Sequence, residues 1–249
     1  MGSGMNSERR LGDPDLLGAA LAARVAGWLA DALDRRPSAT LVVSGGSTPV
    51  PFFRRLSRLD LPWDRVRVTL ADERWVEPWH EDSNEGLVRR ELLTHRAASA
   101  RWVGLKNDAP TPEEGRAEAA ARLAALLPIE VAVLGLGADG HTASLFPRAP
   151  GVAAALDPRG EATVVAVRPP AAPHPRLSLT LAALLGSNRL ALHLTGDDKW
   201  RVYRRAAEAA TADGLPVGAL LSGAAERIEV YWAPTTTSGK DAIGENPGR

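Results

Sequence analysis

Asp139 and His141 are the residues in this sequence best suited to acid–base chemistry. They lie in VLGLGADGHTASLFP, residues 133–147, where an apolar run ends in glycines and is typical of a strand that stops in a tight turn. Because the two residues flank Gly140, their side chains can point the same way in an extended segment. The carboxylate can then fix the tautomer of the imidazole or stabilise its cation, as in a general base. The alternative is a histidine satisfied by a nearby backbone carbonyl.

Water is the predicted attacking group for this chemistry. The chain has no cysteine, which excludes a thiolate nucleophile and a thiolate metal site. Ser144 does not lie in a Gly-x-Ser-x-Gly elbow. The glycines of GLGADG do not form GxGxxG followed by a helix and a ribose-binding acid, which argues against a dinucleotide.

A second motif, SGGSTP at residues 44–49, has the features of an anion site. It follows an apolar run and precedes the helical pattern VPFFRRL, so Ser47 or Thr48 can cap that helix and Pro49 suits its first turn. Glycines let the backbone approach a ligand closely, and free amides at a helix N-terminus attract phosphate. The alternative is an ordinary turn with a good cap.

The third motif places three charges at the end of another apolar run: Asp72, Glu73 and Arg74. Arg74 is the favoured functional residue, because its planar fork of donors suits a phosphate or a developing oxyanion. The alternative is that the three charges neutralise one another on a solvated surface. His80 and Asp82 follow in the same loop, but no third ligand lies at a recognised spacing, so the sequence predicts no metal site.

Two further cations, Arg176 and Lys199, complete the candidates. Arg176 alternates with Ser178 and Thr180 in PRLSLT, which predicts that the three share one face of an extended segment. Lys199 falls in the first turn of an expected helix, where a cation opposes the helix dipole. This unfavourable placement indicates an anionic ligand; the alternative is pairing with a neighbouring aspartate.

The elements that must position these residues alternate between strands and helices. The expected strands are the apolar runs 41–46, 66–73, 101–105, 129–137, 162–167, 189–196 and 227–234. Apolar residues recur at helical spacing in 16–33, 84–93, 113–127 and 197–210. This alternation predicts an α/β fold with a mainly parallel sheet, helices on both faces and ligands at the carboxyl ends of the strands.

Length and composition favour a single domain over residues 11–234, with disordered tails at 1–10 and 235–249. In 249 residues, 30 Lys plus Arg balance 30 Asp plus Glu, so no global field draws the chain to nucleic acid or anionic membranes. No run approaches the roughly 20 apolar residues of a membrane span. The N-terminus lacks the apolar core of a signal peptide, so the cytoplasm is the expected location. A monomer is expected, with a weak homodimer as the alternative.

Taken in order, SGGSTP, DERWV with DSNEGLVRREL, GLGADGHTASLFP, PRLSLT and the Lys199 region resemble the successive motifs of bacterial 6-phosphogluconolactonases, over residues 16–232. The related glucosamine-6-phosphate deaminases share SGGSTP but usually have DEY where this chain has DER, which favours the lactonase branch. The resemblance implies a modified Rossmann-like, three-layer α/β/α fold. It also implies hydrolysis of 6-phospho-D-glucono-1,5-lactone in the pentose phosphate pathway, without cofactor or metal.

The resemblance further implies roles for individual residues. His141 is expected to activate water with Asp139 beside it, while Asp72 and Arg74 line the reacting end. The residues expected to hold the phosphate are Ser44, Gly45, Gly46, Ser47, Thr48, Arg176 and Lys199.

Two other functions remain open at this point. A glucosamine-6-phosphate deaminase/isomerase would release ammonia from the amino sugar. A non-catalytic sugar-phosphate sensor would normally carry a helix-turn-helix segment, and the residues before Leu16 are too few for one.

Overall fold

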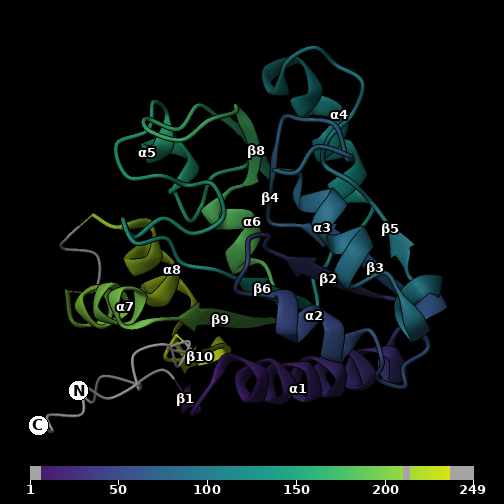
Figure 1. Cartoon of the computed structure of the whole chain (residues 1–249). Coiled ribbons are helices and arrows are strands. Elements are labelled where there is room, and N and C mark those ends of the chain that lie inside the picture. Colours follow the sequence, from purple (N-terminus) through teal and green to yellow (C-terminus); the bar gives the residue numbers. More distant parts are fainter. Residues whose placement is uncertain (1–6, 210–213, 236–249) are drawn as a thin grey trace, which may run out of the picture.

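A seven-stranded parallel sheet forms the centre of the fold in the computed structural model, which describes residues 7–209 and 214–235 (Figure 1). Its strands, in spatial order, are β1 (Ser7–Arg10), β10 (Ile228–Ala233), β9 (Arg189–Thr195), β6 (Val131–Leu134), β2 (Ala39–Val43), β3 (Val66–Leu70) and β5 (Arg101–Trp102). Strands β2 and β6 are buried along their whole length. Buried parallel strands are apolar throughout rather than alternating, which is the pattern that the sequence shows.

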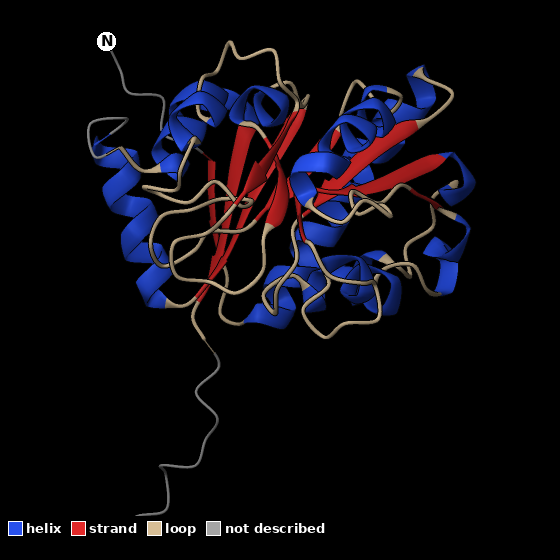
Figure 2. Cartoon of the chain, turned by 90° about the horizontal axis from the view of Figure 1, so that it is seen from above, coloured by secondary structure: helices blue, strands red, loops and turns tan. Residues whose placement is uncertain are grey.

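Helices lie on either side of these strands (Figure 2). They are α1 (Pro14–Arg35), α2 (Val50–Leu56), α3 (Asn84–Glu91), α4 (Pro112–Ala124), α5 (Val152–Ala155), α6 (Leu181–Leu185), α7 (Asp197–Ala209) and α8 (Pro216–Ala224). The four helices predicted from periodicity all form. The short helices α5 and α6, and α8, were not predicted, because four or five residues carry too little periodicity and α8 is apolar on most sides.

Helix α1 begins at Pro14, after Asp13, whose Oδ1 accepts a hydrogen bond from the Leu16 amide at 2.8 Å. By length and composition alone this helix is apolar enough to cross a membrane, which the sequence analysis did not anticipate. Half of its apolar window is buried, and Leu17 and Leu21 are fully covered in the core. It therefore has the packing of a core helix.

A second, antiparallel sheet consists of β4 (Asp72–Arg74), β8 (Arg176–Leu179) and β7 (Val164–Val167). The expected strand over residues 66–73 is thus two strands, because the chain leaves the main sheet after Leu70 and pairs with β8. In the β4–β8 register, Asp72 lies opposite Ser178 and Arg74 opposite Arg176. The second sheet places these charged residues over the end of the main sheet.

Residues 7–10 were expected in a disordered tail, and this prediction is wrong. They form the edge strand β1, parallel to β10, and the Leu11 amide continues the pairing by donating to the Trp232 carbonyl at 3.0 Å. The Tyr203 hydroxyl donates to Glu8 at 2.9 Å, and the Arg10 guanidinium lies 4.3 Å from the centre of a Trp200 ring. Backbone pairing and side-chain contacts hold this polar strand without an apolar face. Residues 1–6 and 236–249 of the expected tails lie outside the described residues.

Candidate active site

A pocket of about 260 Å³ opens where β2, β6 and β9 end. Parallel strands place their carboxyl ends at one edge of a sheet, and ligands of such folds bind there. All but one of the residues predicted for the site line this pocket: Ser44, Gly45, Gly46, Ser47, Thr48, Asp72, Arg74, His141, Arg176 and Lys199. The exception is Asp139, which contacts the ring of His141.

The His141 ring is fixed by its neighbours. Its Nδ1 lies 2.5 Å from Oδ1 of Asp139, and its backbone amide donates to the same oxygen at 3.2 Å. Gly137 leaves room for this ring, because a Cβ on residue 137 would lie 2.2 Å from two ring atoms. The ring of Phe146 packs against the imidazole, with 4.3 Å between ring centres. With Nδ1 engaged by the carboxylate, Nε2 is the nitrogen left to accept a proton. The carboxylate, and not a backbone carbonyl, is the partner of this histidine.

Asp72 and Glu73 point to opposite sides of β4, as alternate residues of a strand do. Asp72 is buried in the pocket wall, where its Oδ2 accepts from the Ser144 hydroxyl at 2.5 Å. Glu73 is fully buried on the other side and accepts from the amides of Asn84 and Glu85, which begin α3. Burial raises the pKa of Glu73 to about 7, an effect that these amides oppose. The solvated charge cluster considered as an alternative is therefore excluded.

Arg74 and Arg176 lie side by side on neighbouring strands of the small sheet. Arg74 donates through Nη1 to the Asp82 carbonyl at 2.5 Å, and its Nε is buried without a partner among the residues described. Nη1 of Arg176 lies 4.0 Å from Oδ2 of Asp72. Burial lowers the pKa of Arg176, and Asp72 opposes that effect. Two guanidinium groups and one carboxylate thus meet at this side of the pocket.

Phe146 connects this side of the pocket to the predicted base. Its ring contacts His141, and the Arg176 guanidinium lies 5.1 Å from the ring centre. Arg176 therefore lies at the His141 side of the pocket. Its sequence-predicted role on the phosphate stays a prediction.

The loop at residues 44–49 follows β2, and glycine is required at two of its positions. Gly46 has a φ of 91°, and a Cβ on Gly45 would lie 1.9 Å from Oδ1 of Asn84. The predicted capping is wrong: the N-cap residue of α2 is Pro49, and no side chain caps this helix. Thr48 instead contacts Thr195 through its hydroxyl at 3.1 Å.

Lys199 lies in the first turn of α7, as predicted, and burial lowers its pKa. The alternative pairing with a neighbouring aspartate is not formed, since Asp198 pairs with Arg201 at 2.6 Å. Lys199 makes no ion pair within the described part of the chain. Its electrostatic neighbour is His193, on β9, which also lines the pocket.

The sequence analysis missed three residues of the site. Asn84 donates through Nδ2 to the Asp72 carbonyl at 2.9 Å, and Ser144 holds the Asp72 carboxylate. Both belong to motifs that were noted, but a short motif does not show which partner it contacts. His193 interrupts the apolar run RLALHLT, and this polar residue inside a buried strand was a signal that the analysis did not use.

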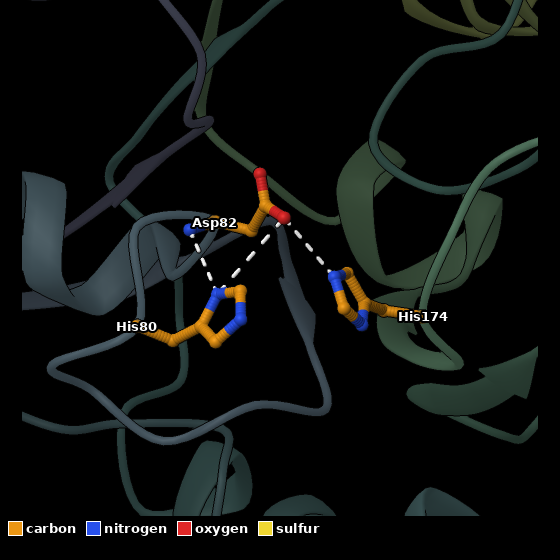
Figure 3. A group of neighbouring side chains, drawn as sticks. All are labelled: His80, Asp82 and His174. Atoms are coloured by element: carbon orange, nitrogen blue, oxygen red, sulfur yellow. Dashed lines mark hydrogen bonds and ion pairs between the residues drawn. The ribbon is translucent and has the colours of Figure 1, made fainter.

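His80, Asp82 and His174 form a cluster (Figure 3). It adjoins the pocket through Arg74, which donates to the Asp82 carbonyl. The sequence offered no third ligand for His80 and Asp82, and the fold supplies one from 92 residues along the chain. The three ligand atoms lie within 4.8 Å of one another, close enough to hold a metal ion. Hydrogen bonds account for the cluster: Asp82 accepts from Nε2 of His174 at 3.0 Å, and Nδ1 of His80 accepts from the Asp82 amide at 3.1 Å. These bonds tie the loop after β4 to the segment before β8.

Comparison with known proteins gives a consistent result. Residues 12–232 match the family described as glucosamine-6-phosphate isomerases/6-phosphogluconolactonase. The 6-phosphogluconolactonase of Rhizobium meliloti is 44% identical over 223 residues, which cover 89% of this chain and 96% of that protein. That of Pseudomonas aeruginosa is 45% identical over 215 residues, 86% of this chain and 89% of that protein. A crystal structure of a 6-phosphogluconolactonase from Shewanella baltica superimposes with a TM-score of 0.89 at 41% identity, covering 93% of this chain and 99% of the other.

Proposed function

Because this chain belongs to the glucosamine-6-phosphate isomerase/6-phosphogluconolactonase family, we propose that it hydrolyses 6-phospho-D-glucono-1,5-lactone to 6-phosphogluconate in the pentose phosphate pathway. The observation that carries the proposal is the Asp139–His141 pair beside a pocket that is also lined by Lys199, a lysine without an ion pair among the described residues. The pair suits activation of water, and the lysine suits a phosphate. A δ-lactone is an activated ester, so a base and an oxyanion donor suffice for its hydrolysis.

In the proposed reaction, Nε2 of His141 removes a proton from water as the water oxygen attacks the lactone carbonyl carbon. Asp139 keeps a proton on Nδ1 and stabilises the imidazolium that forms. The carbonyl oxygen gains negative charge, and Arg74 lies on the side of the pocket where it can stabilise that charge. Collapse of the tetrahedral intermediate breaks the ring C–O bond, and the imidazolium returns its proton to the ring oxygen. The product is an open-chain acid, which ionises.

The phosphate is proposed to bind at the other end of the pocket. The loop at residues 44–48 offers backbone amides and three hydroxyl-bearing side chains, and Lys199 offers an ammonium group whose burial makes an anionic partner favourable. All of these groups come from one chain, which is compatible with a monomer. A phosphorylated lactone is charged and does not cross a bilayer unaided, so we place the enzyme in the cytoplasm.

The deaminase activity found in the same family is disfavoured by Arg74. A fixed guanidinium near the reacting end stabilises an oxyanion but repels a substrate that carries an ammonium group. The test is to give the protein freshly made 6-phosphoglucono-1,5-lactone and, separately, glucosamine 6-phosphate. Rapid lactone opening above an enzyme-free control, with no ammonia from the amino sugar, is expected. Ammonia release together with background lactone opening would replace the lactonase with a deaminase.

An Arg74→Tyr variant sharpens this test, because it introduces the tyrosine that deaminases usually carry at this position. Lactone turnover is expected to fall without any gain of deaminase activity. Retention of full turnover would remove Arg74 from the oxyanion role.

A further inference from the structure

His193 is a buried polar residue that the proposed reaction does not use. It is 3% exposed, and both ring nitrogens are buried with no hydrogen-bond partner among the described protein groups. Buried polar side chains in native proteins are nearly always hydrogen-bonded, and an exception at a binding site requires an explanation. Its strand neighbours Leu192 and Leu194 are apolar and fully buried, on the opposite face of the strand. His193 is thus a polar exception in an apolar strand.

The surroundings of His193 belong to the phosphate end of the pocket. The residue lines the pocket together with Lys199 and the loop at residues 44–49. Phe52, in the helix that follows this loop, meets the imidazole edge-on at 6.1 Å between ring centres. Thr195, two residues further along β9, contacts Thr48 of the same loop. His193 is thus held between the glycine-rich loop and the start of α7.

The charge state of the imidazole is also defined. Burial, with a smaller contribution from Lys199, lowers the pKa of His193 to about 3. The ring is then neutral at physiological pH and offers one N–H donor and one acceptor. A neutral donor beside a lysine adds a hydrogen bond for an anion without adding a second buried positive charge.

We infer that His193 is a specificity-determining residue that donates one hydrogen bond, as a neutral imidazole, to the phosphate of the bound substrate beside Lys199. The inference rests on the proposed function for the identity of the substrate. It adds a recognition group to the phosphate end that neither the motifs nor the family resemblance assigned. It also gives a partner to one of the two ring nitrogens that no other part of the described protein satisfies.

Two variants test this role. His193→Leu removes both polar atoms, and His193→Gln keeps a side-chain N–H donor. His193→Leu is expected to raise KM for 6-phosphogluconolactone roughly tenfold or more, as loss of a hydrogen bond to a charged group does. Hydrolysis of unphosphorylated glucono-1,5-lactone is expected to change little, and His193→Gln is expected to recover most of the affinity. An unchanged selectivity between the two lactones in His193→Leu would overturn the inference.

Thermal unfolding separates this role from a structural one. Replacing an unsatisfied buried imidazole with an apolar side chain is expected to keep or raise the melting temperature of the unliganded protein. A variant that loses both its stability and its activity on both lactones would instead give His193 a structural role and contradict the inference.

The wild-type protein provides a measurement that does not depend on folding of a variant. The ¹⁵N resonances of the His193 ring are expected to move when 6-phosphogluconate or inorganic phosphate is added, and to stay in place with gluconate. Ring resonances that do not shift with any of the three ligands would contradict the inference. Failure of the proposed function would give a different result. The wild-type protein would then bind phosphate at His193 but would not open the lactone.

Discussion

Two side chains of this site, those of His141 and Asn84, have room only because a glycine lies next to each. A side chain at position 137 would occupy the space of the His141 ring, and one at position 45 would occupy the space of Asn84. The base and the loop are therefore positioned as much by the absence of a Cβ as by hydrogen bonds. A substitution at Gly137 is expected to act on catalysis through the histidine that it displaces.

His141→Ala is expected to lower kcat for 6-phosphogluconolactone by at least about 100-fold, since general bases contribute roughly 10²–10⁴-fold. Folding is expected to survive, because the side chain is partly exposed at the pocket. Steady-state kinetics, with circular dichroism as the folding check, measure both. Gly137→Ala serves as a matched variant that keeps the histidine but displaces its ring, and it is expected to show a comparable loss. Near-normal turnover of His141→Ala would remove this residue from the mechanism.

Lys199→Ala and Arg176→Ala are each expected to weaken binding of 6-phosphogluconate while hydrolysis of unphosphorylated gluconolactone changes little. The expected loss of affinity is roughly tenfold or more, as for a lost hydrogen bond to a charged group. Calorimetric titration with 6-phosphogluconate measures the affinity, and kinetics on both lactones measure hydrolysis. Arg201→Ala is the control, because this cation is on the same helix but is exposed and paired with Asp198. Equal losses on both lactones would place the mutated cation at the carbonyl. The comparison matters most for Arg176, because its guanidinium lies over Phe146, which contacts His141.

At the scale of elements, the pocket is built from the main parallel sheet and the small antiparallel sheet. Two loops of the small sheet are joined by the bond between His174 and Asp82, and the backbone carbonyl of Asp82 in turn holds Arg74. His174 adopts a φ of 69°, an uncommon conformation for a residue other than glycine. This strained residue is retained where its side chain links the two loops that flank the arginines.

His174→Asn is expected to lower kcat for the lactone by a small factor, with KM less affected, because Arg74, the proposed oxyanion donor, loses its fixed anchor. Asparagine tolerates a positive φ, so the backbone is expected to remain. His95→Asn is a matched control, since His95 also has a positive φ, of 49°, and is exposed outside the pocket. Identical kinetics for both variants would show that the link between the loops does not support the site.

The sequence could predict the strands that end at the pocket, because buried parallel strands are long apolar runs whose ends are marked by glycine or charge. It could not predict the small sheet, since Asp72–Arg74 is three residues long and has no apolar pattern. Strand β1 was missed for a similar reason: its SERR sequence is polar, and its pairing with β10 is a contact between the two ends of the chain. The His174–Asp82 contact likewise depends on tertiary structure that local spacing does not encode.

At the scale of the whole molecule, two buried titratable groups give the stability opposite dependences on pH. The pKa of His193 falls from 6.5 to about 3 on folding, so the unfolded chain binds the extra proton between these values. The free energy of unfolding therefore falls as the pH drops below 6.5. The pKa of Glu73 rises from 4.5 to about 7, so its contribution to stability is greatest below pH 4.5 and is lost as the pH rises through 7.

The wild type is expected to lose about 2 to 3 kcal/mol more stability than His193→Leu between pH 7 and pH 4.5, because only the wild type carries the histidine with the lowered pKa. The Glu73 contribution is common to both proteins and cancels in the difference. Urea denaturation in a phosphate-free buffer, at several pH values, measures this. Parallel stability curves for the two proteins would show that His193 does not resist protonation in the folded state.

Because the pocket lies between two sheets, it is expected to select substrates by their length. The loop after β2 and Lys199 after β9 are attached to the main sheet, whereas Arg74 is attached to the small one, so the fold sets the span between them. A 1,5-lactone whose phosphate is one carbon farther from the ring cannot fit both ends at once. Seven-carbon 1,5-lactones phosphorylated on C7 are accordingly expected to have kcat/KM roughly tenfold or more below that of the six-carbon substrate, as one misfitted methylene can cause. Equal turnover of both chain lengths would mean that the sheets move relative to each other and that the pocket measures charge but not length.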